Sequence, residues 1–111
     1  MILNGFDIGW QNAFEKRLSY LKELFPELEY KTLERHNAML RVEADLKDDP
    51  LGQQVINNVL YCIERDSAKT CEACGNGGRR ITKEQYFDEP KTLCITCYAL
   101  ILDKIIQALD K

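Results

Sequence analysis

The chain has 111 residues, of which 45% are hydrophobic and 30% charged, and its formal net charge is −3. This composition is typical of a compact globular protein and excludes a disordered or collagen-like chain. No apolar run reaches the ~18 residues that a membrane helix needs, and the first residues lack the basic start and long apolar stretch of a secretory leader. We therefore expect a cytoplasmic protein that makes no membrane contact.

The first predicted helix runs from about Ile8 to Phe25. Its large apolar residues recur every three or four positions, as they do on one face of a helix. These residues are Trp10, Phe14, Leu18, Leu21, Leu24 and Phe25. Asp7 is placed to cap the helix, and Pro26 ends it.

A short antiparallel hairpin is expected next. Residues 40–44 alternate apolar and charged side chains, which is the pattern of a half-buried strand. The segment 28–33 is its expected partner, with a turn at His36-Asn37, because asparagine tolerates the left-handed conformation. The alternation slips by one residue near Thr32, which indicates either a bulge or a short helix.

A second helix is predicted from Pro50 to about Ser67, with Asp49 as its cap. Apolar residues at four-residue steps predict its buried stripe. The stripe consists of Leu51, Val55, Val59, Cys62 and Ile63, widened by Ile56 and Leu60. Since Cys62 falls on this stripe, its predicted role is core packing.

The last helix begins at the final cysteine pair and has a broad apolar face. This face consists of Tyr98, Ile101, Leu102, Ile105, Ile106 and Leu109. We expect the helix to fold back onto the first two helices and close the core. The alternative is that part of the face, Ile101 and Ile105, stays exposed and forms a homodimer or binds a partner.

Two Cys-x-x-Cys pairs, Cys71/Cys74 and Cys94/Cys97, are separated by 19 residues. In a reducing compartment this spacing predicts one zinc ion bound by four thiolates, with Gly75 allowing the backbone to turn beneath the metal. Free thiols or a redox pair are the alternative, but redox motifs of this kind occur within a βαβ pattern that the chain lacks. Four cysteines leave no open position for a catalytic water, so the expected site is structural.

The remaining polar residues do not form a catalytic set. Lys69, Arg79, Arg80 and Lys83 lie near the cysteines in sequence and could offset thiolate charge; phosphate binding by Arg79 and Arg80 is the alternative. His36, the only histidine, is expected at a turn or on the surface. No phosphate loop, nucleophile elbow or spaced carboxylate pair is present, so we expect no enzyme activity.

Together these elements predict an α+β fold with two modules. Residues 1–66 form a helix–hairpin–helix module with 8 Lys and Arg against 12 Asp and Glu. Residues 67–111 form a four-cysteine zinc ribbon or knuckle with a C-terminal helix, and contain 7 basic against 6 acidic residues. The acidic balance argues against nucleic-acid binding and favours a protein partner.

The cysteine segment resembles the zinc finger of the DksA/TraR family, whose members regulate RNA polymerase through its secondary channel. The resemblance covers about 40 residues: Cys71-Glu72-Ala73-Cys74-Gly75-Asn76, Arg79-Arg80, and Leu93-Cys94-Ile95-Thr96-Cys97 with the helix after it. That family carries an Asp-x-x-Asp-x-Ala pattern at a helical tip, whose nearest match here is Asp45, Asp48 and Pro50 in a predicted loop.

Nearly the whole chain is also similar to a group of small bacterial and phage proteins of unassigned function. The similarity rests on Gly9-Trp10, Leu40-Arg41-Val42, Asp66-Ser67-Ala68-Lys69-Thr70-Cys71 and Thr92-Leu93-Cys94. It implies a bacterial or phage source and an α+β fold joined to a zinc knuckle.

Three functions are consistent with these observations. The first is a non-enzymatic, zinc-binding protein that binds and modulates or neutralises a protein partner, as phage-encoded inhibitors and immunity proteins do. The second is transcription regulation on RNA polymerase through the finger and the loop with Asp45, Asp48 and Asp49. The third is a nucleic-acid-binding zinc module that uses Arg79, Arg80 and Lys83.

Overall fold

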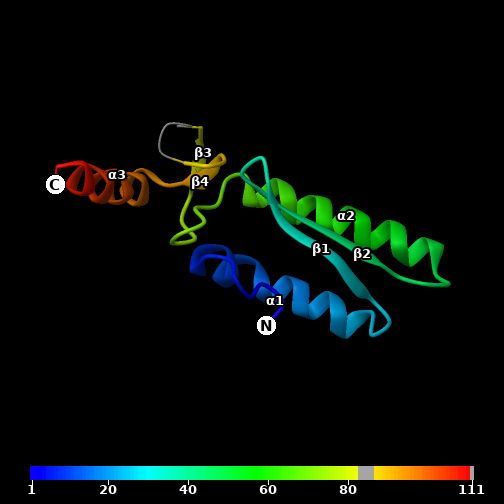
Figure 1. Cartoon of the computed structure of the whole chain (residues 1–111). Helices are drawn as coiled ribbons and strands as arrows, with labels where there is room; N and C mark the ends of the chain where they lie inside the picture. The colour runs from blue at the N-terminus through cyan, green and yellow to red at the C-terminus, as the bar shows by residue number, and fades with distance from the viewer. Residues whose placement is uncertain (83–86, 111) are drawn as a thin grey trace.

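The computed structural model describes residues 1–82 and 87–110 and shows an α+β fold, as the sequence predicts. The elements are α1 (Ile8–Leu24), β1 (Glu29–His36), β2 (Met39–Asp45), α2 (Pro50–Ser67), β3 (Arg79–Ile81), β4 (Lys91–Leu93) and α3 (Ile95–Leu109). The molecule is elongated, with extents of 58 × 21 × 21 Å. In Figure 1, α1, α2 and the first hairpin form one end, and α3 extends from the other.

Helix α1 matches its prediction to within one residue. Asp7 occupies the N-cap with extended backbone, although its side chain makes no capping hydrogen bond. The buried face of α1 contains Trp10, Phe14, Leu18 and Leu21, whose spacing of three or four residues places them on one side. Pro26 follows the helix end, as expected from its missing N–H group.

Strands β1 and β2 form a two-stranded antiparallel sheet. The register shifts between Tyr30 and Thr32, so the predicted bulge is confirmed. The turn lies one residue later than predicted, at Asn37 and Ala38, whose φ angles are 53° and 67°. Two consecutive left-handed residues are typical of the two-residue hairpin turn whose twist matches that of the strands.

Helix α2 has the predicted bounds, and its Asp49 cap accepts a hydrogen bond of 2.9 Å from the Gly52 N–H. The predicted buried stripe is confirmed at Ile56, Leu60 and Ile63 and is wrong at its first two members, since Leu51 is 72% exposed and Val55 46% exposed. The buried row is Gly52, Ile56, Leu60, Ile63 and Ser67. Cys62 is only half-buried, so the prediction that it packs in the core is also wrong.

A single main core joins three of these elements. Alternate residues of β2 point into it, and α1 and α2 close it. It contains Leu3, Trp10, Phe14, Leu18, Leu21, Leu28, Leu40, Val42, Ala44, Ile56, Leu60 and Ile63. Between the buried residues of β2, the charged residues Arg41, Glu43 and Asp45 are more exposed, which is the pattern of a sheet with one solvated face.

The expectation that the last helix folds back onto the first two helices is wrong. No residue of α3 is buried, and the helix extends away from α1 and α2 (Figure 1). Its first turns pack instead on a small second core of Cys71, Phe87 and Leu93, which Tyr98 and Ile101 contact. The hairpin of β3 and β4 sets this direction, because α3 follows β4 after a single residue.

Candidate metal centre

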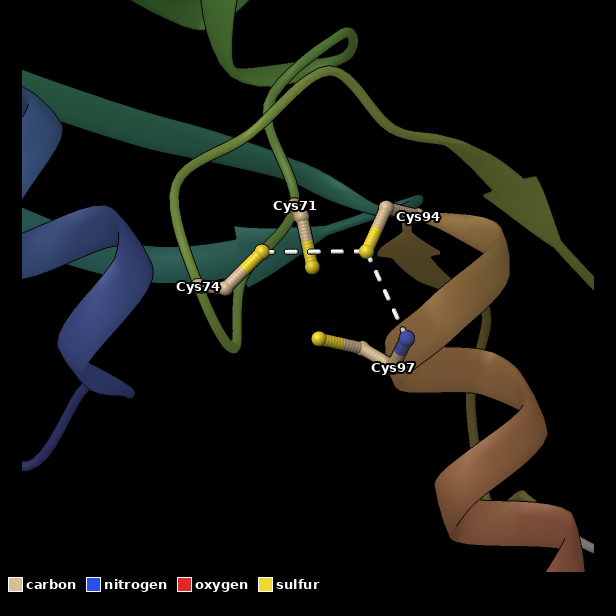
Figure 2. A group of neighbouring side chains, drawn as sticks. All are labelled: Cys71, Cys74, Cys94 and Cys97. Atoms are coloured by element: carbon tan, nitrogen blue, oxygen red, sulfur yellow. Dashed lines mark hydrogen bonds between the residues drawn. The ribbon is translucent and has the colours of Figure 1, made fainter.

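The first cysteine pair lies in a tight loop after α2. The Cys71 N–H donates to the Asn76 carbonyl at 2.7 Å, and the Gly75 N–H donates to the Cys71 carbonyl at 2.9 Å. Gly75 has a φ of +86°, a left-handed conformation that glycine adopts at little cost, as its predicted role requires. These bonds close the knuckle, so both cysteine side chains leave it on the same side (Figure 2).

The second pair begins α3. Cys94 is the N-cap of the helix, and its Sγ accepts a hydrogen bond of 3.4 Å from the Cys97 N–H. Cys97 lies in the first turn, three residues on, which places its side chain on the same helix face. The Glu72 N–H donates to the Thr92 carbonyl at 2.9 Å, and this bond fixes the two pairs relative to each other.

The four sulfur atoms form one cluster. All of them lie within 4.8 Å of one another, and Cys74 Sγ and Cys94 Sγ are 3.7 Å apart (Figure 2). A tetrahedron with metal–sulfur bonds of ~2.3 Å has edges of about 3.8 Å, so the cluster needs only a small contraction to surround one ion. These residues therefore fit a tetrahedral metal ion with thiolate ligands.

The cluster also favours a thiolate at one position. The hydrogen bond from the Cys97 N–H lowers the pKa of Cys94 to about 7. The pKa of Cys97 is raised, because its own side chain donates toward the neighbouring sulfurs, above all that of Cys94. A bound cation would displace the protons that remain on the cluster.

Helix α1 packs directly against the first knuckle. A Cβ atom on Gly9 would lie 2.4 Å from the Cys71 carbonyl oxygen and 2.6 Å from the Gly75 nitrogen. The Trp10 indole Nε1–H donates to the Thr70 carbonyl at 3.0 Å, and the Trp10 backbone N–H donates to the Glu72 carbonyl at 3.3 Å. The absent side chain of Gly9 therefore allows the helix and the knuckle to touch backbone to backbone.

The sequence did not predict a buried carboxylate between Cys71 and Cys74. Glu72 is fully buried and accepts from Arg35 Nε at 2.5 Å and from the Thr92 N–H at 2.8 Å. Arg35 also pairs with Glu89 at 2.6 Å and lies 5.7 Å from the centre of the Trp10 ring. The only signal of this ion pair in the sequence is a glutamate inside a Cys-x-x-Cys loop, and that signal does not identify Arg35 as its partner.

The other residues singled out in the sequence lie outside the cysteine cluster. His36 is exposed at the end of β1, and Lys69 and Arg79 are exposed. Arg80 donates to Asn37 Oδ1 at the hairpin turn. Lys83 lies outside the described residues.

The acidic loop between β2 and α2 is far from the cluster in Figure 1, at the end of the molecule opposite α3. Asp45, Asp48 and Asp49 are all exposed there. Asp48 has a φ of 60°, and the Asp49 side chain caps α2. One of the three carboxylates is therefore already used by the fold.

Within residues 1–82 and 87–110, no helix is long and apolar enough to cross a membrane. Comparison of the chain with protein families, with curated proteins and with solved structures found no match.

Proposed function

We propose that the chain is a non-enzymatic, zinc-stabilised protein that binds a protein partner through α3 and thereby modulates or neutralises it. The observation that carries this proposal is the exposed apolar row on α3. We define this row, the α3 stripe, as Ile95, Leu102, Ile106 and Leu109, of which Leu102 is half-buried and the other three are exposed.

The residues of the α3 stripe have the spacing of an apolar helix face that binds a partner protein. They are seven, four and three residues apart, which aligns them on one helix face. Ile95, Ile106 and Leu109 are between 61% and 72% exposed. An apolar helix face of this kind binds in the hydrophobic groove of a partner, where such residues serve as anchors.

Zinc is the metal that we infer for the cluster. Four thiolates in a tetrahedron suit zinc, and they leave no ligand position for a reacting water. The bound ion would join the loop with Cys71 and Cys74 to the first turn of α3 with Cys94 and Cys97. Zinc would thus fix the direction in which α3 projects.

Capture from a lysate of the source organism, followed by mass spectrometry, tests the proposal. The test variant is the double substitution Ile106→Glu with Leu109→Glu. Its control is Leu24→Glu with Leu51→Glu, because these leucines are 74% and 72% exposed on α1 and α2. Both pairs add two acidic residues at exposed apolar positions, so a nonspecific effect of charge would appear in both.

We expect one protein to be retained by the wild type and by the control, and to be lost from the α3 variant. Circular dichroism and zinc content should be equal in all three chains. Equal capture by the α3 variant would refute the assignment of the partner surface. A wild-type dimer that only the α3 variant dissociates would instead show that the stripe binds a second copy.

Regulation of RNA polymerase is a second candidate. It is supported by the exposed carboxylates of Asp45 and Asp48 at one tip of the elongated molecule. Binding to purified RNA polymerase tests it. The double variant Asp45→Asn with Asp48→Asn should lose binding or regulation, whereas the α3 variant should retain both.

A further inference from the structure

The free edge of β2 borders a groove. The groove has a volume of about 560 Å³ and lies between β2 and α2. Val42 and Ala44 line it from the strand, and Asn57, Tyr61 and Glu64 line it from the helix. The sheet has only two strands, so the edge of β2 that faces away from β1 has no neighbouring strand among the described residues.

Three hydrogen bonds show which backbone groups face away from β1. The Leu40 N–H donates to Ser67 Oγ at 2.7 Å, the Ala44 carbonyl accepts from Gln53 Nε2 at 2.9 Å, and the Leu46 N–H donates to Gln53 Oε1 at 2.6 Å. In an antiparallel strand, both backbone groups of every second residue point to the same side. The N–H and C=O of Val42, between these positions, therefore point toward the groove.

The open part of this edge is short and bounded. Ser67 occupies one end and Gln53 the other, and no described residue bonds to the N–H or C=O of Val42 on this side. The Leu40 carbonyl and the Ala44 N–H flank Val42 on the same edge. Four backbone groups are thus available over about 13 Å of strand, which matches an extended segment of three to five residues.

The walls of the groove indicate the chemistry of that segment. Glu43, Asp45 and Glu64 are acidic, and the basic side chain among the lining residues, Arg41, pairs with Glu43 at 3.0 Å. Tyr61 lines the groove and is 63% exposed, and an exposed aromatic ring can contact an aliphatic or cationic side chain. Helix α2 stands along the edge, so a lone peptide strand fits the groove better than the edge of a second sheet.

We propose that the groove between β2 and α2 binds an extended, basic peptide segment of a partner protein, which adds to the free edge of β2 as a third strand. Backbone hydrogen bonds to Val42 and its neighbours supply the pairing, and the acidic wall selects for lysine and arginine. This inference is independent of the α3 stripe, because the two surfaces share no residue.

Three capped pentapeptides serve as probes: alternating lysine and valine, alternating glutamate and valine, and alternating lysine and proline. Backbone amide resonances and hydrogen exchange are measured by NMR on the full chain. In the free protein, the amides of Val42 and Ala44 should exchange faster than those of Arg41 and Glu43, which bond to β1. The lysine–valine peptide should slow the exchange of Val42 and Ala44.

The glutamate peptide should bind at least about fivefold more weakly, because its charge is repelled by the groove. The lysine–proline peptide should also bind at least about fivefold more weakly than the lysine–valine peptide, because proline has no N–H to donate. The double variant Asp45→Lys with Glu64→Lys should weaken binding of the lysine–valine peptide by about fivefold or more. Its control, Glu23→Lys near the end of α1 with Glu27→Lys in the turn after it, changes two exposed glutamates outside the groove lining. It makes the same change in net charge and should weaken binding less than about twofold.

Slow exchange of Val42 in the free protein would overturn the proposal, because the edge would already be paired. Equal binding of the proline peptide, or equal losses in the two double variants, would also overturn it by showing nonspecific charge attraction. Protection of Val42 that rises with protein concentration would assign the groove to a second copy instead.

Discussion

Arg35 and Glu72 form an ion pair that joins the first hairpin to the loop of Cys71 and Cys74 across 37 residues of sequence. The Glu72 side chain is fully buried, and that of Arg35 is 19% exposed. Glu72 lies between Cys71 and Cys74 in sequence and its carboxylate is buried, so Arg35 supplies the positive charge that this buried position needs.

Substituting Arg35→Ala should destabilise the zinc-loaded chain by about 3 kcal/mol, because removal of one partner leaves a buried charge unpaired. The matched control is Arg41→Ala, an arginine of the same hairpin whose ion pair with Glu43 is exposed on both sides. Its loss should cost less than about 1 kcal/mol. Denaturant unfolding with excess zinc gives both values, and similar losses in the two variants would contradict the assigned role of Glu72.

We predict one zinc ion per chain, bound by the four clustered cysteines. Serine in place of Cys71 or Cys94 should abolish stoichiometric zinc, because the remaining thiolates cannot complete the tetrahedron. Cys62→Ser is the control, since Cys62 lies outside the cluster. Metal analysis of the purified variants decides this. Retained zinc without Cys71, or zinc lost without Cys62, would refute the ligand set.

Zinc affinity should fall as the pH falls, because each ligand must lose its proton before it binds the metal. The pKa of Cys94 is about 7 in the metal-free cluster, so this thiol is mostly ionised at pH ~8 and mostly protonated at pH ~6. Zinc binding should therefore release about one more proton at pH ~6 than at pH ~8. Zinc titration in weak buffer with a pH indicator measures this difference, and equal release at both values would refute the lowered pKa.

The sequence predicted the cysteine cluster and the main elements because each depends on local signals. Asp49 and Pro50 indicate the start of α2 from the first turn alone, and the spacing of the two Cys-x-x-Cys pairs alone indicates which cysteines cluster. The phase of the α2 stripe was not predictable in the same way. Val55 and Ile56 both belong to apolar rows at four-residue steps, and packing in the fold, not the spacing, buries Ile56 and leaves Val55 46% exposed.

The sequence also did not predict the direction in which α3 projects. The apolar face of α3 is consistent with both a core helix and a projecting helix, because periodicity does not specify what a helix packs against. The direction of α3 depends on the single residue that links it to β4. Strands β3 and β4 have only three residues each, which is a weak signal in the sequence. The Arg35–Glu72 pair was hidden for the same reason, since its partners are brought together only by the fold.

Removal of zinc should affect the two parts of the chain differently. The main core of α1, β2 and α2 contains no cysteine of the cluster, whereas the second core includes Cys71 itself. After chelation, amide protection should persist in residues 10–25 and 51–66 and disappear in residues 71–97. Hydrogen exchange with mass spectrometry tests this. Simultaneous loss in all three segments would show that the metal holds the whole chain together.

The contact between α1 and the knuckle gives the last prediction. Gly9→Ala should destabilise the chain by several kcal/mol, because the new Cβ would lie 2.4–2.6 Å from three backbone atoms of the knuckle. These atoms belong to Cys71, Glu72 and Gly75, so they cannot move aside without disturbing the metal ligands. Zinc affinity should therefore fall together with the free energy of unfolding.

The matched control is Gly77→Ala, in the same loop, where a Cβ would meet no atom within 4 Å. That variant should change stability by less than about 1 kcal/mol. Competition with a chromogenic chelator gives the zinc affinity, and denaturant unfolding gives the stability. A Gly9→Ala chain that is as stable as the control and retains its zinc affinity would show that the close contact with α1 does not position the loop of Cys71 and Cys74.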